Sequence, residues 1–154
     1  MPSVDQDYLM RAIQQLAEAL RQILKLQKLG LLQEALAEIF ATNQSLVGLD
    51  AQLFDLLDSA TLVRQLGAER LEIAALLITE EAEVRQALGD FPRSFVLRRR
   101  ALEFLLETRA GGATLGHRSM IAVRDLLEYT GSDQLSDRLR AELDELRPLL
   151  PPAE

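Results

Sequence analysis

The sequence predicts an all-α protein of seven or eight helices, arranged as stacked antiparallel hairpins or as a compact helical bundle. Apolar residues recur three or four positions apart almost throughout the chain, as they do on one face of a helix. Valine, isoleucine and threonine nowhere alternate with polar residues over four or more positions, as a half-buried strand would require. Glycines separate the periodic stretches and supply helix stops. We therefore expect helices joined by short links, without strands.

The first two predicted helices form a hairpin over about residues 6–28 and 32–43. Lysines near the end of the first helix interact favourably with the negative end of its dipole, and Gly30 tolerates a left-handed C-terminal turn. The link is so short that the second helix must fold back antiparallel on the first. Their apolar stripes are Leu9, Ile13, Leu16, Leu20 and Ile23 on the first helix, and Leu32, Ala35, Leu36, Ile39 and Phe40 on the second.

Two short helices are expected next, over 49–58 and 59–66, the second capped by Ser59 and stopped by Gly67. A long helix follows over 68–88, although the segment 79–81 could equally be an N-terminal signal that splits it. Gly89 ends this helix in either case.

Three further helices complete the prediction. One begins at Asp90-Phe91-Pro92, since proline is tolerated in a first turn, and reaches about residue 109 with Phe95, Leu102, Leu105 and Leu106 on its buried side. Another spans about 115–129. The last begins near residue 132 and carries the stripe Leu135, Leu139, Leu143, Leu146 and Leu150. The prolines at 148, 151 and 152 predict a frayed tail over 148–154.

Composition narrows the class of protein. The chain has 154 residues, 48% of them hydrophobic, so we expect a single helical domain over 1–154 with a proper core. The absence of cysteine excludes disulfides and zinc–thiolate sites and suits a reducing compartment. No export signal is visible at the N-terminus, and the longest aliphatic run, 73–78, is far too short to span a bilayer. We expect a cytoplasmic protein without membrane association.

One stretch resembles a known family. The segment Lys28-Leu29-Gly30-Leu31-Leu32-Gln33-Glu34-Ala35 has the glycine and small-residue spacing of a tetratricopeptide repeat where its two helices meet. The resemblance implies that Gly30 and Ala35 are structural, with Ala35 letting the two helices approach closely and Ile39 as the large apolar residue one turn later. The family's aromatic and glycine positions in the first helix and its closing proline have no counterpart, and no second copy aligns about 34 residues away. The resemblance therefore implies a tetratricopeptide-like hairpin rather than a full array.

The N-terminal part, from Asp5-Gln6-Asp7-Tyr8-Leu9-Met10-Arg11 through 46–50, also resembles a family of uncharacterised small bacterial helical proteins. The match covers roughly the first 60 residues. It implies a bacterial cytosolic protein and contributes nothing on mechanism.

The sequence contains few residues that are suited to catalysis. His117 is the only histidine, which excludes histidine-rich metal sites by count, and Ser119 is too near to it in sequence to be a convincing nucleophile partner. We predict no catalytic, cofactor-binding or metal-ligating residue, no cofactor and no enzymatic activity.

Charge is unevenly distributed along the chain. Residues 91–124 hold seven arginines and two glutamates, whereas 1–90 hold seven basic and fourteen acidic residues, and 125–154 hold three and eight. This basic segment either pairs with the protein's own acidic helices, which we favour, or binds an acidic partner. Within it, Arg99 is expected to be the internal, structural arginine, and Arg98 and Arg100 are candidate contacts to an anionic partner. We do not expect a nucleic-acid partner, because no base-stacking aromatics are interleaved with the arginines.

These observations lead to two hypotheses of function. The first is a non-enzymatic interaction module whose stacked hairpins present a groove to a peptide or partner helix. The alternative is a pocket between helices for a small apolar or anionic ligand. The stripe Leu139, Leu143 and Leu146 could pack inside the monomer or form a homodimer.

Overall fold

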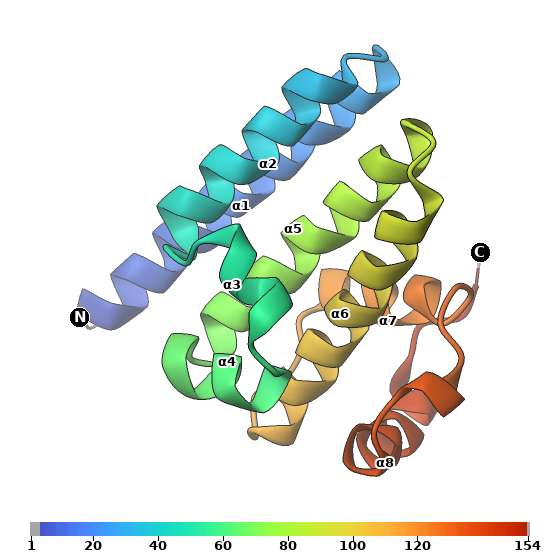
Figure 1. Cartoon of the computed structure of the whole chain (residues 1–154). Coiled ribbons are helices and arrows are strands. Elements are labelled where there is room, and N and C mark those ends of the chain that lie inside the picture. The colour runs from blue at the N-terminus through green and yellow to red at the C-terminus, as the bar shows by residue number, and fades with distance from the viewer. Residues whose placement is uncertain (1–3, 154) are drawn as a thin grey trace.

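The computed structural model describes residues 4–153, which form eight α-helices and two 3₁₀ turns and contain no strand (Figure 1). The all-α prediction is confirmed. The helices are α1 (Val4–Lys28), α2 (Leu32–Leu46), α3 (Ala51–Leu56), α4 (Ser59–Leu66), α5 (Ala68–Ala87), α6 (Phe91–Ala110), α7 (His117–Leu126) and α8 (Asp137–Leu146), and the 3₁₀ turns are η1 (Ser132–Gln134) and η2 (Arg147–Leu149).

Two antiparallel hairpins, α1–α2 and α5–α6, organise the molecule (Figure 1). Helices α3 and α4 link them, and α7 and α8 both pack on α6. The turn of the first hairpin forms as predicted: Gly30 has a φ of 74°, and the amides of Gly30 and Leu31 donate to the carbonyls of Gln27 and Leu26 at 3.0 and 2.9 Å. Ala35 is fully buried, as a close helix crossing requires.

Helix α5 lies at the centre, in contact with α1, α2, α4, α6 and α7. All six residues from 73 to 78 are buried, which is typical of a helix that is apolar all round and surrounded by others. The helix is continuous through residues 79–81, so the alternative of a split there is wrong. A single apolar cluster joins buried residues from each of the eight helices.

Several predicted boundaries and faces are wrong. Helix α4 is capped by Asp58, whose Oδ1 accepts from the Thr61 amide at 2.7 Å, and Ser59 instead turns inward. Helix α8 begins only after Ser136, which caps it, and ends before Pro148, because proline cannot continue the backbone ladder. Ile13, Phe40 and Phe95 were expected in buried stripes, but they are 62%, 41% and 41% exposed.

The C-terminal segment packs against the rest of the chain. Residues 147–149 form a 3₁₀ turn, and Leu150 packs against the core. Arg124 contacts the chain near its C-terminal end, because its Nη1 donates to the carbonyl of Pro152 at 2.7 Å. Leu150 and Pro152 thus contact the rest of the chain, the frayed tail over 148–154 stays a prediction, and Glu154 lies outside the described residues.

Helix α8 is held on α6 by apolar and ionic contacts together. Leu139, Leu143 and Leu146 are 2%, 0% and 1% exposed within the chain itself, so they are not available to a second copy. Of the two alternatives, packing inside the monomer is the one that the structure shows for these leucines. In the described part of the chain, no helix is both long enough and apolar enough to cross a membrane.

Candidate functional site

The three consecutive arginines of α6 occupy three different environments. Arg98 is buried, with its Nη2 3.0 Å from Glu83 Oε1 and its guanidinium 3.7 Å from the centre of the Tyr129 ring. Arg99 is the most exposed of the three and lies 3.7 Å from Glu103. The prediction that Arg99 is the internal arginine is therefore wrong, and Arg98 takes that place.

Arg100 anchors a helix end rather than a partner. Its Nη2 donates to the carbonyls of Phe54, at 2.7 Å, and Leu57, at 2.5 Å, at the C-terminus of α3, where helix carbonyls lack partners of their own. The guanidinium stacks on the Phe104 ring at 4.7 Å, and burial lowers the pKa of Arg100 below its ordinary value. Arg98 and Arg100 both contact acceptors inside the chain, and their contact with an anionic partner stays a prediction.

Most arginines of the basic segment pair with the chain's own acids. Arg93 pairs with Asp55 of α3 through two hydrogen bonds of 3.1 Å, and Arg109 pairs with Glu142 and Glu145 of α8 at 2.7 and 3.3 Å. Acids from α3, α5, α6 and α8 thus lie within 4 Å of most of its arginines. The favoured reading, internal pairing, is confirmed.

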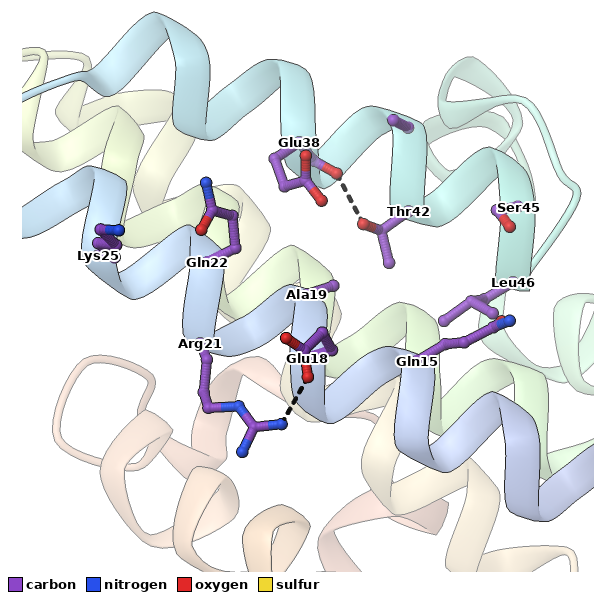
Figure 2. A pocket seen from close by; sticks show the side chains of 11 residues that line it. Gln15, Glu18, Ala19, Arg21, Gln22, Lys25, Glu38, Thr42, Ser45 and Leu46 are labelled. Carbon is purple, nitrogen blue, oxygen red and sulfur yellow. Dashed lines mark hydrogen bonds and ion pairs between the residues drawn. The ribbon is translucent and has the colours of Figure 1, made fainter.

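Two concave surfaces lie along α1 and are candidates for binding. The first, here called the α1–α2 trough, has a volume of about 600 Å³ and lies between α1 and α2 (Figure 2). Eight of its eleven lining residues are polar or charged. Arg21 pairs with Glu18 at 2.8 Å, and Thr42 donates to the Glu38 carbonyl at 2.8 Å, as Figure 2 shows. These groups satisfy one another locally, which is typical of a solvated face.

The second surface, here called the α1–α5 groove, is apolar at its base. It has a volume of about 470 Å³, and half of its fourteen lining residues are aliphatic. Helix α1 contributes Leu9, Ala12, Ile13, Leu16 and Ala17, α5 contributes Glu69, Glu72, Ile73 and Leu76, and the start of α7 contributes Thr114, Gly116, His117, Arg118 and Ser119.

Glu72 of α5 joins the start of α7 to one side of the groove by hydrogen bonds. One oxygen of this carboxylate, Oε2, accepts from the Gly116 amide at 3.2 Å and from the Ser119 hydroxyl at 2.5 Å. Ser119 is 1% exposed and held by Glu72, so it does not meet His117 in a nucleophile–base pair. No group of three or more potential metal ligands comes together among the residues described.

Helices α1 and α5 meet again beyond the groove. The Gln27 side-chain amide donates to Glu80 Oε2 at 2.9 Å, and burial raises the pKa of Glu80. The charge of Arg118 opposes this shift, so Arg118 lies close enough to act electrostatically on Glu80. The groove is therefore bounded at one end by a polar contact between the two helices that form its base.

Sequence reasoning found part of this site and misplaced the rest. Leu9, Ile13 and Leu16 were recognised as one stripe but assigned to the core, whereas Ile13 is 62% exposed at the groove. The sequence did not predict Glu69 and Glu72 as site residues, because acidic residues are common at the start of a helix. The sequence of α1 does contain a signal for this site. Its apolar residues cover more of the helix than one core-facing stripe needs, and Tyr8, Met10 and Ile13 are all exposed.

Comparisons with protein-family models, curated proteins and solved structures give no match to this chain. Its function is therefore argued from the geometry of the α1–α5 groove.

Proposed function

We propose that the protein is a non-enzymatic helical interaction module that binds a partner helix in the α1–α5 groove. The proposal rests on one observation. A groove of about 470 Å³ with an aliphatic base is open between α1 and α5, and Ile13, which lines it, is 62% exposed. A large aliphatic side chain so exposed beside other aliphatic residues marks a binding groove better than a scattered surface residue does.

The shape of the groove favours a helix as its occupant. Both walls are helices whose backbone groups are hydrogen-bonded internally, so an extended peptide would find no strand edge to pair with. The lining residues recur at helical spacing, over two turns of α1 and two turns of α5. A third helix can pack its own ridges into such a surface, as helices do in bundles.

Peptide selection followed by one variant tests the proposal. Helical peptides are selected from a display library on the folded protein, and their affinities are then measured for the wild type and for Ile13→Glu. We expect Ile13→Glu to weaken binding by about tenfold or more, because it places a charge where the partner buries apolar surface.

Leu29→Glu is the matched control. Leu29 is 61% exposed, almost the same as Ile13, but lies in the α1–α2 turn away from the groove. This variant should bind the selected peptides like the wild type. Equal affinity of the wild type and Ile13→Glu for every selected peptide would refute the proposal.

A small apolar ligand is the second candidate. The volume of the groove falls within the range of ligand pockets, and its base is aliphatic. Native mass spectrometry of the purified protein distinguishes the two: a bound small molecule in the wild type that is absent from Ile13→Glu would favour this alternative.

A further inference from the structure

We infer that the partner helix of the α1–α5 groove carries lysine or arginine beside its apolar seam. This inference rests on the proposed function and adds the chemistry of the partner. It is carried by the charges that border the groove on the side of α5.

Acidic side chains follow α5 along the groove. Glu69 and Glu72 line it, three positions apart and therefore on the same side of the helix, and Ile73 and Leu76 continue that side as the apolar base. Glu80 follows one turn after Leu76. A helix lying against Ile73 and Leu76 would thus pass its flank beside two carboxylates.

The carboxylates of Glu69 and Glu72 have no ion pair among the described side chains. No lysine or arginine of the described side chains lies within 4 Å of the carboxylate of Glu69 or of Glu72. Arg118 at the start of α7 acts on Glu80, whose pKa its charge lowers against the effect of burial. His117 is the other basic side chain at the groove. The α5 flank is therefore acidic.

Glu72 is also fixed in place before any partner arrives. Both of its hydrogen bonds, to the Gly116 amide and the Ser119 hydroxyl, go to Oε2. A carboxylate held in this way loses little further side-chain entropy when a cation approaches it. Glu69 is exposed one turn earlier and supplies a second contact for a basic side chain. Complementary charge of this kind sets the choice and orientation of a partner more than its total affinity.

Two synthetic peptides test the inference. Both are capped amphipathic helices of about twelve residues with the same leucine seam, long enough to cover two to three turns. They differ only at the flanking positions, which are lysine in one and glutamate in the other. We expect the lysine peptide to bind the wild type about fivefold more tightly at low ionic strength, with the difference shrinking as salt is added.

Glu69→Lys should abolish the preference, because the added lysine offsets the remaining charge of Glu72, and Glu34→Lys is its matched control. Glu34 occupies the first turn of α2 as Glu69 occupies the first turn of α5, so both substitutions remove the same favourable interaction with a helix dipole. Only Glu69 borders the groove. The control should keep the preference for the lysine peptide.

The outcomes separate this inference from the proposed function. If both peptides bind with equal affinity, or the glutamate peptide binds more tightly, and both lose affinity in Ile13→Glu, the inference is refuted and the groove stands as a binding site. If neither peptide binds, or Ile13→Glu leaves both affinities unchanged, the proposed function falls and the inference with it.

Discussion

Arg98, Arg99 and Arg100 show how far neighbouring positions can differ in role. Consecutive residues on a helix are separated by about 100°, so three of them cannot share one environment. Arg98 shares the buried side of α6 with Ser94, Leu97 and Ala101, whereas Arg99 points toward solvent and Glu103. The prediction followed a stripe through Phe95 and Leu102, whereas a stripe through Ser94 and Ala101 includes Arg98.

Replacing Arg100 tests its structural role. Arg100→Ala removes the donor for two carbonyls at the end of α3, so we expect a loss of about 1.5–3 kcal/mol in the free energy of unfolding, the range for hydrogen bonds to charged groups. Urea unfolding measures it. Arg99→Ala, the control one residue away, should cost less than about 1 kcal/mol, as expected for an exposed ion pair. Equal losses in the two variants would contradict the assignment.

At the scale of elements, α8 depends on a buried carboxylate. Glu107 of α6 is 4% exposed, and Arg138 of α8 donates two hydrogen bonds to it, at 2.9 and 2.7 Å. The Ser59 hydroxyl of α4 donates a third, at 2.9 Å. One carboxylate therefore connects three helices, and α6 is the helix on which α8 packs.

A double substitution tests whether Arg138 and Glu107 contribute to the free energy of unfolding as a pair. Arg138→Met leaves Glu107 buried without its cation, and we expect a loss of about 3 kcal/mol in the free energy of unfolding, reduced where water reaches the half-exposed Arg138 site. Adding Glu107→Gln should recover part of that loss, because the buried charge is then absent. Thermal unfolding of the two single variants and the double variant checks this. Additive losses would show that the two side chains do not act as a pair.

The contact between α1 and α5 should depend on pH. Burial raises the pKa of Glu80 above its ordinary value of 4.5, so the folded state binds the proton more tightly than the unfolded state does. The contribution of Glu80 to stability is therefore greatest at low pH and is lost as pH rises from the ordinary value through the raised pKa.

Glu80→Gln removes this titration while keeping an acceptor for Gln27. We expect the variant to melt at a higher temperature than the wild type at neutral pH, with the difference disappearing toward about pH 4. Thermal melts of both proteins at the two pH values measure it. A variant less stable than the wild type at neutral pH would show that the Glu80 charge is instead stabilised, for instance by Arg118.

The whole molecule buries its C-terminal leucines without a second copy. Leu143 is 0% exposed in the single chain, so its contribution to stability should not depend on association. We expect Leu143→Ala to cost about 2–5 kcal/mol and the melting temperature of both proteins to be independent of protein concentration. A melting temperature that rises with concentration in the wild type and not in the variant would show that these leucines form an interface.

The local sequence determined the helices of this protein. Signals such as Gly30, Gly67, Gly89 and Asp90-Phe91-Pro92 act within one turn of the backbone, so they mark the ends of α1, α4, α5 and α6 whatever the rest of the chain does. The start of α8 was missed, because a 3₁₀ turn and Ser136 interrupt a leucine spacing that looks continuous.

Only the tertiary structure decided which faces are covered. Helix α6 touches α5 and three other helices, so its C-terminal half is buried on almost every side and no single stripe describes it. Helix α1 is apolar over more of its circumference than α2 and α5 cover, which leaves Ile13 exposed at the α1–α5 groove. An apolar residue on a helix is equally suited to a core and to a binding surface, and the difference depends on neighbours that lie far away in the sequence.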